Sequence, residues 1–185
     1  MDIFAHGLWT GAAATAVNKK LKAKNKKTLN VWLTTFWGVF PDLFAFAIPF
    51  AWITSGILTG ALHFSDIPRP HEIEGPTSKV YWVIHLAQQL YNISHSGVVF
   101  AAVFLLAWAF ARRPVYEMLG WLMHLLIDIP THSLQFYPTP IFWPISNWVF
   151  AYGIAWSQWW FQIINYSTLI AVYIWLWREN KKTAS

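Results

Sequence analysis

Long runs without charged residues alternate with short polar segments along this chain. No Asp, Glu, Lys or Arg occurs in the 23 residues from Leu43 to Ser65, the 32 from Val80 to Ala111, or the 49 from Ile129 to Trp177. A helix that spans a bilayer needs roughly 20 predominantly apolar residues. Each run is therefore long enough to cross a membrane, and the pattern predicts an integral membrane protein with an all-α fold.

The same pattern predicts a polytopic transmembrane helical bundle of about five helices in a single domain, residues 1–185. The second helix is expected to be broken near Pro41 and Pro49, because proline lacks a backbone N–H and clashes with the preceding turn. A Pro-rich loop, with Pro138, Pro140 and Pro144, is expected before the last helix. The expected helices cover residues 2–17, 29–60, 79–111, 115–129 and 148–178.

The cations fall on one side of this topology. With five crossings, every Lys and Arg except Arg69 and Lys79 lies on the same side. The positive-inside rule assigns that side to the cytoplasm. We therefore expect the C-terminus in the cytoplasm, and the N-terminus and the Pro-rich loops outside. The cytoplasmic cations would be Lys19, Lys20, Lys22, Lys24, Lys26, Lys27, Arg112, Arg113, Arg178, Lys181 and Lys182.

Composition excludes several classes of protein. Charged residues make up only 11% of the chain and apolar residues 56%, whereas a soluble domain has roughly 25% charged residues. The chain has no Cys, which removes disulfides, Cys-ligated zinc, iron–sulfur clusters and thiol nucleophiles. The Lys-rich segment is short and has no interleaved aromatic residues, so no nucleic-acid partner is expected.

Several ionisable or polar side chains stand inside the apolar runs, where they normally face the bundle interior and mark function. Asp42 follows Pro41, His6 lies in the first expected helix, and His132 lies just beyond the fourth. His85 and His95 belong to the third. They share one helical stripe with polar residues at spacings of three and four, which are Gln88, Gln89, Asn92 and Ser96.

His124 and Asp128 form the most specific pair. Their spacing of i and i+4 aims both side chains at one point, the geometry by which a helix gives a metal two ligands. Histidine and carboxylate without Cys suit zinc, and also manganese, iron or nickel. Asn92 or Ser96 is a candidate to fix the tautomer of a ligand His. Glu117 lies one heptad before His124, but near the expected cytoplasmic end, and is interpreted as structural.

In chain order, these residues resemble a known family of small inner-membrane proteins of bacteria or archaea, described as membrane-bound metal-dependent hydrolases. The resemblance spans nearly the whole chain, and residues 120–147 are its specific part. Leu90 and Tyr91 stand where family members often have a His-Arg pair. The matching segments are His6-Gly7, Phe40-Pro41-Asp42, Ser94-His95-Ser96, Gly120 to His124, Asp128 to Ser133, Phe136 to Pro140, and Trp143 to Ser146. The residue order is also distantly similar to that of zinc-dependent phospholipase C.

The resemblance implies a membrane-embedded metal-dependent hydrolase that acts on a phosphoester of a lipid or lipid-linked substrate through a metal-activated water. It implies one or two divalent ions, most simply zinc, and the expected orientation in the membrane makes the site open to the outer side. The metal ligands would be His6, Asp42, His95, His124, Asp128 and His132, with Asp42, His124 and Asp128 catalytic. Two alternatives remain open at this point: an intramembrane proton or metal-ion transporter, and a non-catalytic scaffold with a structural metal.

Overall fold

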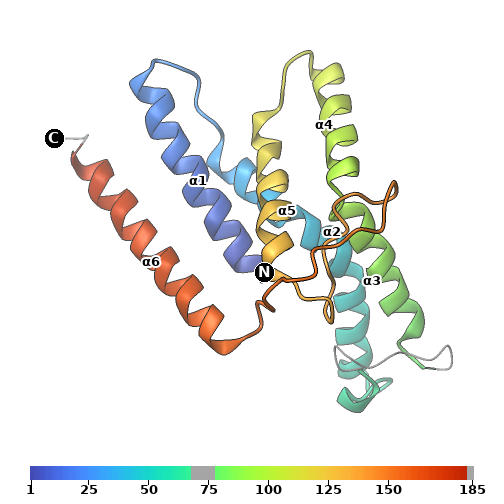
Figure 1. Cartoon of the computed structure of the whole chain (residues 1–185). Coiled ribbons are helices and arrows are strands. Elements are labelled where there is room, and N and C mark those ends of the chain that lie inside the picture. Colours follow the sequence, from blue (N-terminus) through green and yellow to red (C-terminus); the bar gives the residue numbers. More distant parts are fainter. Residues whose placement is uncertain (68–77, 183–185) are drawn as a thin grey trace.

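The computed structural model describes residues 1–67 and 78–182, and this part of the chain is helical with no strands (Figure 1). The all-α class is therefore confirmed. Two short 3₁₀ helices, η1 (Phe64–Asp66) and η2 (Tyr116–Met118), accompany the α-helices. The α-helices are α1 (Ile3–Ala23), α2 (Val31–Leu58), α3 (Tyr81–Ser94), α4 (Gly97–Ala111), α5 (Leu119–Thr131) and α6 (Trp159–Lys182).

The described helices differ in their capacity to cross a membrane. Only α2 is long and apolar enough by itself, while α3 and α4 meet the same requirement as a pair bent by 59°. Helix α5 has 13 residues and is therefore about 20 Å long, shorter than the roughly 30 Å hydrocarbon core of a bilayer. The predicted bundle of five crossings is not confirmed.

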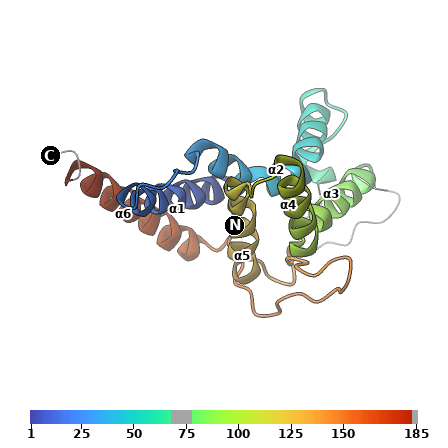
Figure 2. The same ribbon diagram turned by 90° about the horizontal axis from the view of Figure 1, so that it is seen from above.

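The expected break in the second helix is wrong. Helix α2 continues through both Pro41 and Pro49, which are buried inside it. Figures 1 and 2 show that α2 bends partway along its length instead of ending. A proline removes one backbone hydrogen bond and causes a kink, and in an apolar helix the adjacent turns and neighbouring helices can accommodate that loss.

The expected third helix, residues 79–111, is in fact two helices. It stops at Ser94 and starts again in a new direction at Gly97. The Ser96 side chain accepts hydrogen bonds from the backbone nitrogens of Val98 and Val99, both at 3.1 Å. This N-cap satisfies two donors at the start of α4, and it stabilises a break that leaves His95 between the two helices.

The Pro-rich loop is confirmed and is longer than predicted. The last helix begins at Trp159 and not near residue 148, so residues 132–158 connect α5 to α6 without an α-helix. Most of the connection between the second and third expected helices, residues 68–77, lies outside the described residues.

Helices α1, α2 and α5 form the centre of the molecule, with α6 beside α1 at one edge and α3 and α4 at the other (Figures 1 and 2). Glycines allow the central helices to approach closely. A Cβ atom at Gly38 of α2 would lie 2.2 Å from Thr10 Oγ1 of α1, and one at Gly120 of α5 would lie 2.2 Å from the Thr34 carbonyl oxygen of α2. The three backbones therefore meet near the middle of the fold.

Polar contacts fix α6 against the first half of α1. The Trp9 indole N–H donates to Asn165 Oδ1 at 2.8 Å, and the Tyr166 hydroxyl donates to Asp2 Oδ1 at 2.8 Å. The segment of α1 that carries His6 is therefore held by α6 on one side and by α2 on the other.

Three helix ends that carry or precede cations lie close to one another in height. The C-terminal ends of α1, α4 and α6, which carry or precede the Lys and Arg clusters, are on the same side of the molecule in Figure 1. Which compartment that side faces stays a prediction.

Candidate metal centre

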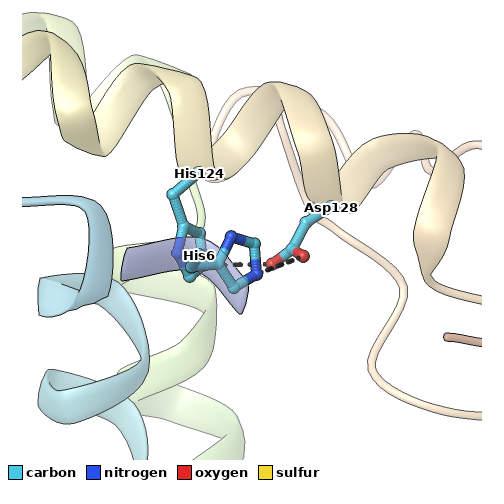
Figure 3. Close-up of side chains that lie close together, drawn as sticks. All are labelled: His6, His124 and Asp128. Carbon is cyan, nitrogen blue, oxygen red and sulfur yellow. Dashed lines mark ion pairs between the residues drawn. The ribbon is translucent and has the colours of Figure 1, made fainter. Parts of the chain in front are cut away.

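The site is built around the pair His124 and Asp128 of α5, which meets His6 of α1 (Figure 3). His6 Nε2 lies 2.9 Å from Asp128 Oδ1, and His124 Nε2 lies 3.1 Å from Asp128 Oδ2. The rings of His6 and His124 are stacked, with centroids 3.6 Å apart. All three side chains are buried, so a residue from the start of the chain and two from α5 meet in the interior of the protein.

Asp42 and His95 approach the same group of side chains from another direction. His95 Nε2 is 3.0 Å from His124 Nε2, and 3.5 Å from both Asp42 Oδ1 and Asp128 Oδ2. Asp42 comes from α2, whereas His95 comes from the break between α3 and α4. The break that sequence periodicity missed is thus the feature that turns His95 into the site.

His132, the residue after α5, is the sixth member. Its Nε2 lies 3.3 Å from Asp128 Oδ1. The structure therefore brings together all six residues that the sequence proposed as ligands. Within this set, two groups each have donor atoms within 4.8 Å of one another, namely His6–His124–Asp128 and Asp42–His95–His124. The two groups share His124. Whether the residues ligate a metal stays a prediction.

Backbone carbonyls orient two of the imidazoles. His124 Nδ1 lies 2.8 Å from the Gly38 oxygen, and His132 Nδ1 lies 2.7 Å from the Tyr137 oxygen. Because a carbonyl only accepts, Nδ1 of each ring carries a hydrogen, and in the neutral ring the lone pair is on Nε2. Both lone pairs therefore face Asp128, and a carbonyl in this position is a common partner of a metal-binding His.

The partners that the sequence proposed for this role were wrong. Ser96 caps α4 and donates its hydroxyl hydrogen to the Trp143 carbonyl, and Asn92 accepts a hydrogen bond from Gln88 at 2.9 Å. The His95 ring is instead contacted by Ser94, whose Oγ lies 2.9 Å from Nδ1. Gly38 could not be found from the sequence, because a backbone carbonyl leaves no trace in residue type.

Asp128 Oδ2 and both ring nitrogens of His6 are buried and make no well-formed hydrogen bond among the described residues. His6 Nε2 nevertheless lies 2.9 Å from Asp128 Oδ1. In addition, the His124 lone pair faces both a carboxylate oxygen at 3.1 Å and a second imidazole nitrogen at 3.0 Å. Electron pairs that face each other in a buried space repel unless a proton or a metal cation lies between them. Imidazole and carboxylate donors fit a divalent ion such as zinc.

The Met1 nitrogen is a further neighbour of the carboxylate. It contacts Asp128 Oδ1 and lies 2.9 Å from His132 Nε2. The oxygen Oδ1 is therefore surrounded by nitrogen atoms, whereas Oδ2 faces His95 and His124.

Tyr91 is a site residue that the sequence analysis missed. Its ring stacks on His95 with centroids 3.7 Å apart, and its hydroxyl donates to the Tyr137 carbonyl at 2.7 Å. The same hydroxyl lies 3.4 Å from His132 Nδ1. Tyr91 was noted only as a departure from a resembling family, yet its i, i+4 relation to His95 was a signal that the two share a helix face.

The remaining ionisable candidates lie outside the site. Glu117 Oε1 accepts a hydrogen bond from the Asn30 nitrogen at 3.2 Å, which agrees with a structural role at the start of α2. His85 is exposed, with its ring 4.4 Å from that of Tyr81. The predicted polar stripe of the third helix is therefore divided, because His95 turns inward while His85 does not.

Taken together, an all-helical chain with a long apolar helix, extensive exposed apolar surface and a buried His and Asp cluster belongs to the class of helical membrane proteins. Residues 1–184 match the family described as YdjM inner membrane protein, and the chain belongs to that family. The inner-membrane family expected from the sequence is thus confirmed, and a location in a lipid bilayer follows from it. Comparisons with curated proteins and with solved structures gave no significant match.

Proposed function

We propose that this protein is a membrane-embedded metal-dependent hydrolase that cleaves a phosphoester of a lipid or lipid-linked substrate. The observation that carries the proposal is the convergence of four imidazole Nε2 atoms on two carboxylates in a buried space. Zinc suits this donor set best, and manganese, iron and nickel accept the same donors.

The number of available ligand atoms permits one or two ions. His124 Nδ1 is occupied by the Gly38 carbonyl, so its single free lone pair binds one ion only. A first ion would be held by His6, His124 and Asp128. A second ion would then rely on His95 and Asp42, with Asp128 as the carboxylate that reaches both positions. When bound, a divalent ion polarises a phosphoryl oxygen and lowers the pKa of a water molecule to about 7.

Asp42 is the residue placed to meet a substrate. Its side chain is 13% exposed, whereas those of His95 and Asp128 are fully buried. The Asp42 carboxylate can accept a proton from the attacking water while Asp128 stays behind the imidazoles. The next two residues, Leu43 and Phe44, are exposed apolar side chains. This neighbourhood favours a substrate with hydrocarbon chains, in keeping with a lipid and an opening toward the outer leaflet.

Metal content tests the ligand assignment. We expect detergent-purified wild-type protein to retain a stoichiometric divalent metal by elemental analysis, and His124→Ala and Asp128→Ala to lose it. His85→Ala is the matched control, because it removes an exposed histidine outside the site. Equal metal content in all four proteins would remove the assignment. A panel of phospholipids then tests activity, with metal-dependent release of a phosphorylated product in the wild type and none in the two site variants.

Ion transport is a second candidate, favoured by the break between α3 and α4. The two helices bend by 59° at a short interruption that contains His95, and interrupted helices commonly form the ion sites of transporters. Reconstituted vesicles distinguish the two functions. Metal-ion flux without lipid hydrolysis would favour transport, and retained metal with neither activity would favour a structural metal in a scaffold.

A further inference from the structure

A cavity of about 530 Å³ opens between α1 and α6, at the end of α1 away from the metal centre. Its volume is in the range of small-ligand sites. Side chains of α1 line most of it, and the cavity wall also includes Asn180 of α6. The polar residues from α1 are Thr15, Asn18, Lys19 and Lys22.

The two lysines of this cavity have different surroundings. Lys19 is held between the two helices, with Nζ 3.4 Å from Glu179 Oε2 and 6.0 Å from the centroid of the Trp175 ring. Lys22 makes no ion pair within the part of the chain that the structure describes. Glu117, the other acidic residue near this end, accepts a hydrogen bond from the Asn30 nitrogen and does not line the cavity. The cavity therefore keeps a positive charge.

Asn18 and Thr15, which also line the cavity, use their side chains in bonds within the protein, so the lysines are the groups that would bind a ligand. Asn18 uses both ends of its amide on Leu29, donating to its carbonyl at 2.9 Å and accepting from its nitrogen at 2.8 Å. The Thr15 hydroxyl donates to the Gly11 carbonyl at 2.8 Å. The two Asn18 bonds fix the loop after α1 in place, whereas the Thr15 bond lies within α1. A lysine ammonium has three hydrogens to donate, so an anion with several oxygens is the ligand that fits.

The position of the cavity along α1 indicates the source of such an anion. Lys22 follows His6 by 16 residues on one helix, a separation of about 24 Å along its axis. The hydrocarbon core of a bilayer is about 30 Å thick. If the metal centre lies near one interface, the cavity lies near the level of the opposite headgroups. Exposed Trp175 of α6, which lies beside Lys19, adds apolar surface nearby for acyl chains.

We propose that this cavity binds the phosphate headgroup of an anionic phospholipid, such as phosphatidylglycerol, through Lys19 and Lys22. Basic pockets between helices commonly recognise such headgroups. The proposal does not depend on the proposed hydrolase, because the two sites share no residue.

Lipid binding to the full chain in detergent tests it, measured by native mass spectrometry with phosphatidylglycerol and phosphatidylcholine. We expect the double variant Lys19→Gln/Lys22→Gln to bind phosphatidylglycerol at least tenfold more weakly than the wild type. The matched control is Lys26→Gln/Lys27→Gln, which removes the same charge nearby but outside the cavity, and we expect no more than a twofold effect. Phosphatidylcholine should bind weakly to all. An equal loss in both double variants would overturn the proposal, because it would show diffuse attraction to the basic end.

Single variants of Lys22 and competition with inorganic phosphate distinguish the remaining explanations. Lys22→Gln alone retains the contact of Lys19 with Glu179, and should still lose about fivefold in affinity, as expected for one lysine near an anionic lipid surface; Lys22→Arg should recover it. Inorganic phosphate is the competing source of the same chemistry. If it displaces the lipid at low millimolar concentration and stabilises the protein as well as the lipid does, the cavity is a free-phosphate site and the lipid assignment is wrong.

Discussion

Gly38 orients the His124 ring, because its carbonyl oxygen lies 2.8 Å from Nδ1, the ring nitrogen that points away from Asp128. Gly38 also permits the close approach of α1 to α2, because a side chain there would collide with Thr10. One residue therefore sets both the spacing of two helices and the direction of the His124 lone pair. The orientation of the proposed ligand therefore depends on backbone packing.

Widening the contact between α2 and α5 should weaken the site without removing any ligand. In Gly120→Ala the new methyl group would lie 2.2 Å from the Thr34 carbonyl oxygen, so α5 must move away. Overpacking of this kind costs about 1–3 kcal/mol. We expect a lower melting temperature and weaker metal binding, measured by thermal unfolding in detergent and by chelator competition. Leu126→Ala, at an exposed position of the same helix, should change neither property strongly.

Removing the charge of Asp128 should be more severe than removing an orienting group. Asp128→Asn keeps the shape of the side chain but loses the negative charge that five nitrogen atoms surround. Loss of an outer partner weakens metal affinity roughly 10- to 100-fold, and we expect a larger effect here, measured by chelator competition. Asp66→Asn, a carboxylate outside the site, is the control. Wild-type affinity in Asp128→Asn would contradict the assignment.

Tyr91→Phe isolates the role of one hydroxyl group. The ring stacked on His95 is retained, while the donor to the Tyr137 carbonyl is lost. Because this carbonyl also contacts His132 Nδ1, we expect about tenfold weaker metal binding. We also expect a loss of about 1 kcal/mol in the free energy of unfolding. Tyr116→Phe, at an exposed tyrosine, should leave both measurements unchanged. A Tyr91→Phe protein that binds metal like the wild type would limit Tyr91 to packing.

The attachment of α6 to α1 should depend on Asn165. Asn165→Ala leaves the partly buried Trp9 indole N–H without its 2.8 Å acceptor, and an unsatisfied donor costs up to about 1–3 kcal/mol when it is fully buried. We expect a lower unfolding temperature and faster proteolysis of the α6 segment. Gln88→Ala removes an exposed amide pair on α3 and serves as the comparison, with little expected change.

The turn after α2 should respond to acid through Asp66. A hydrogen bond from the His63 backbone and another from Lys79 hold the pKa of the Asp66 carboxyl below its usual value. Because the folded pKa is lowered, the contribution to stability is present above the usual pKa of about 4 and is lost as the pH falls through the folded value. Carboxyl chemical shifts of Asp66 check the direction, and Lys79→Gln should move the titration upward.

The sequence predicted which His and Asp residues lie close together better than it predicted the course of the helices. Prolines at positions 41 and 49 suggested a break in α2 that does not occur, because a bent helix can retain its remaining hydrogen bonds. At His95 the uniform apolar pattern concealed a real break, since periodicity carries no signal for a cap and a change of direction. Local propensity is weak at both places, and contacts with other helices decide the outcome.

The sequence by itself determined an apolar, helical protein of the membrane, and a sparse set of His and Asp residues too costly to bury without a purpose. Only the tertiary structure decided that residues 6, 42, 95, 124, 128 and 132 meet in one place. It also decided that backbone carbonyls of Gly38 and Tyr137 orient two of the imidazoles. The physical reason is that the crossing of helices and the choice of a backbone carbonyl as hydrogen-bond acceptor depend on how separate segments pack. Neither can be predicted from the local sequence.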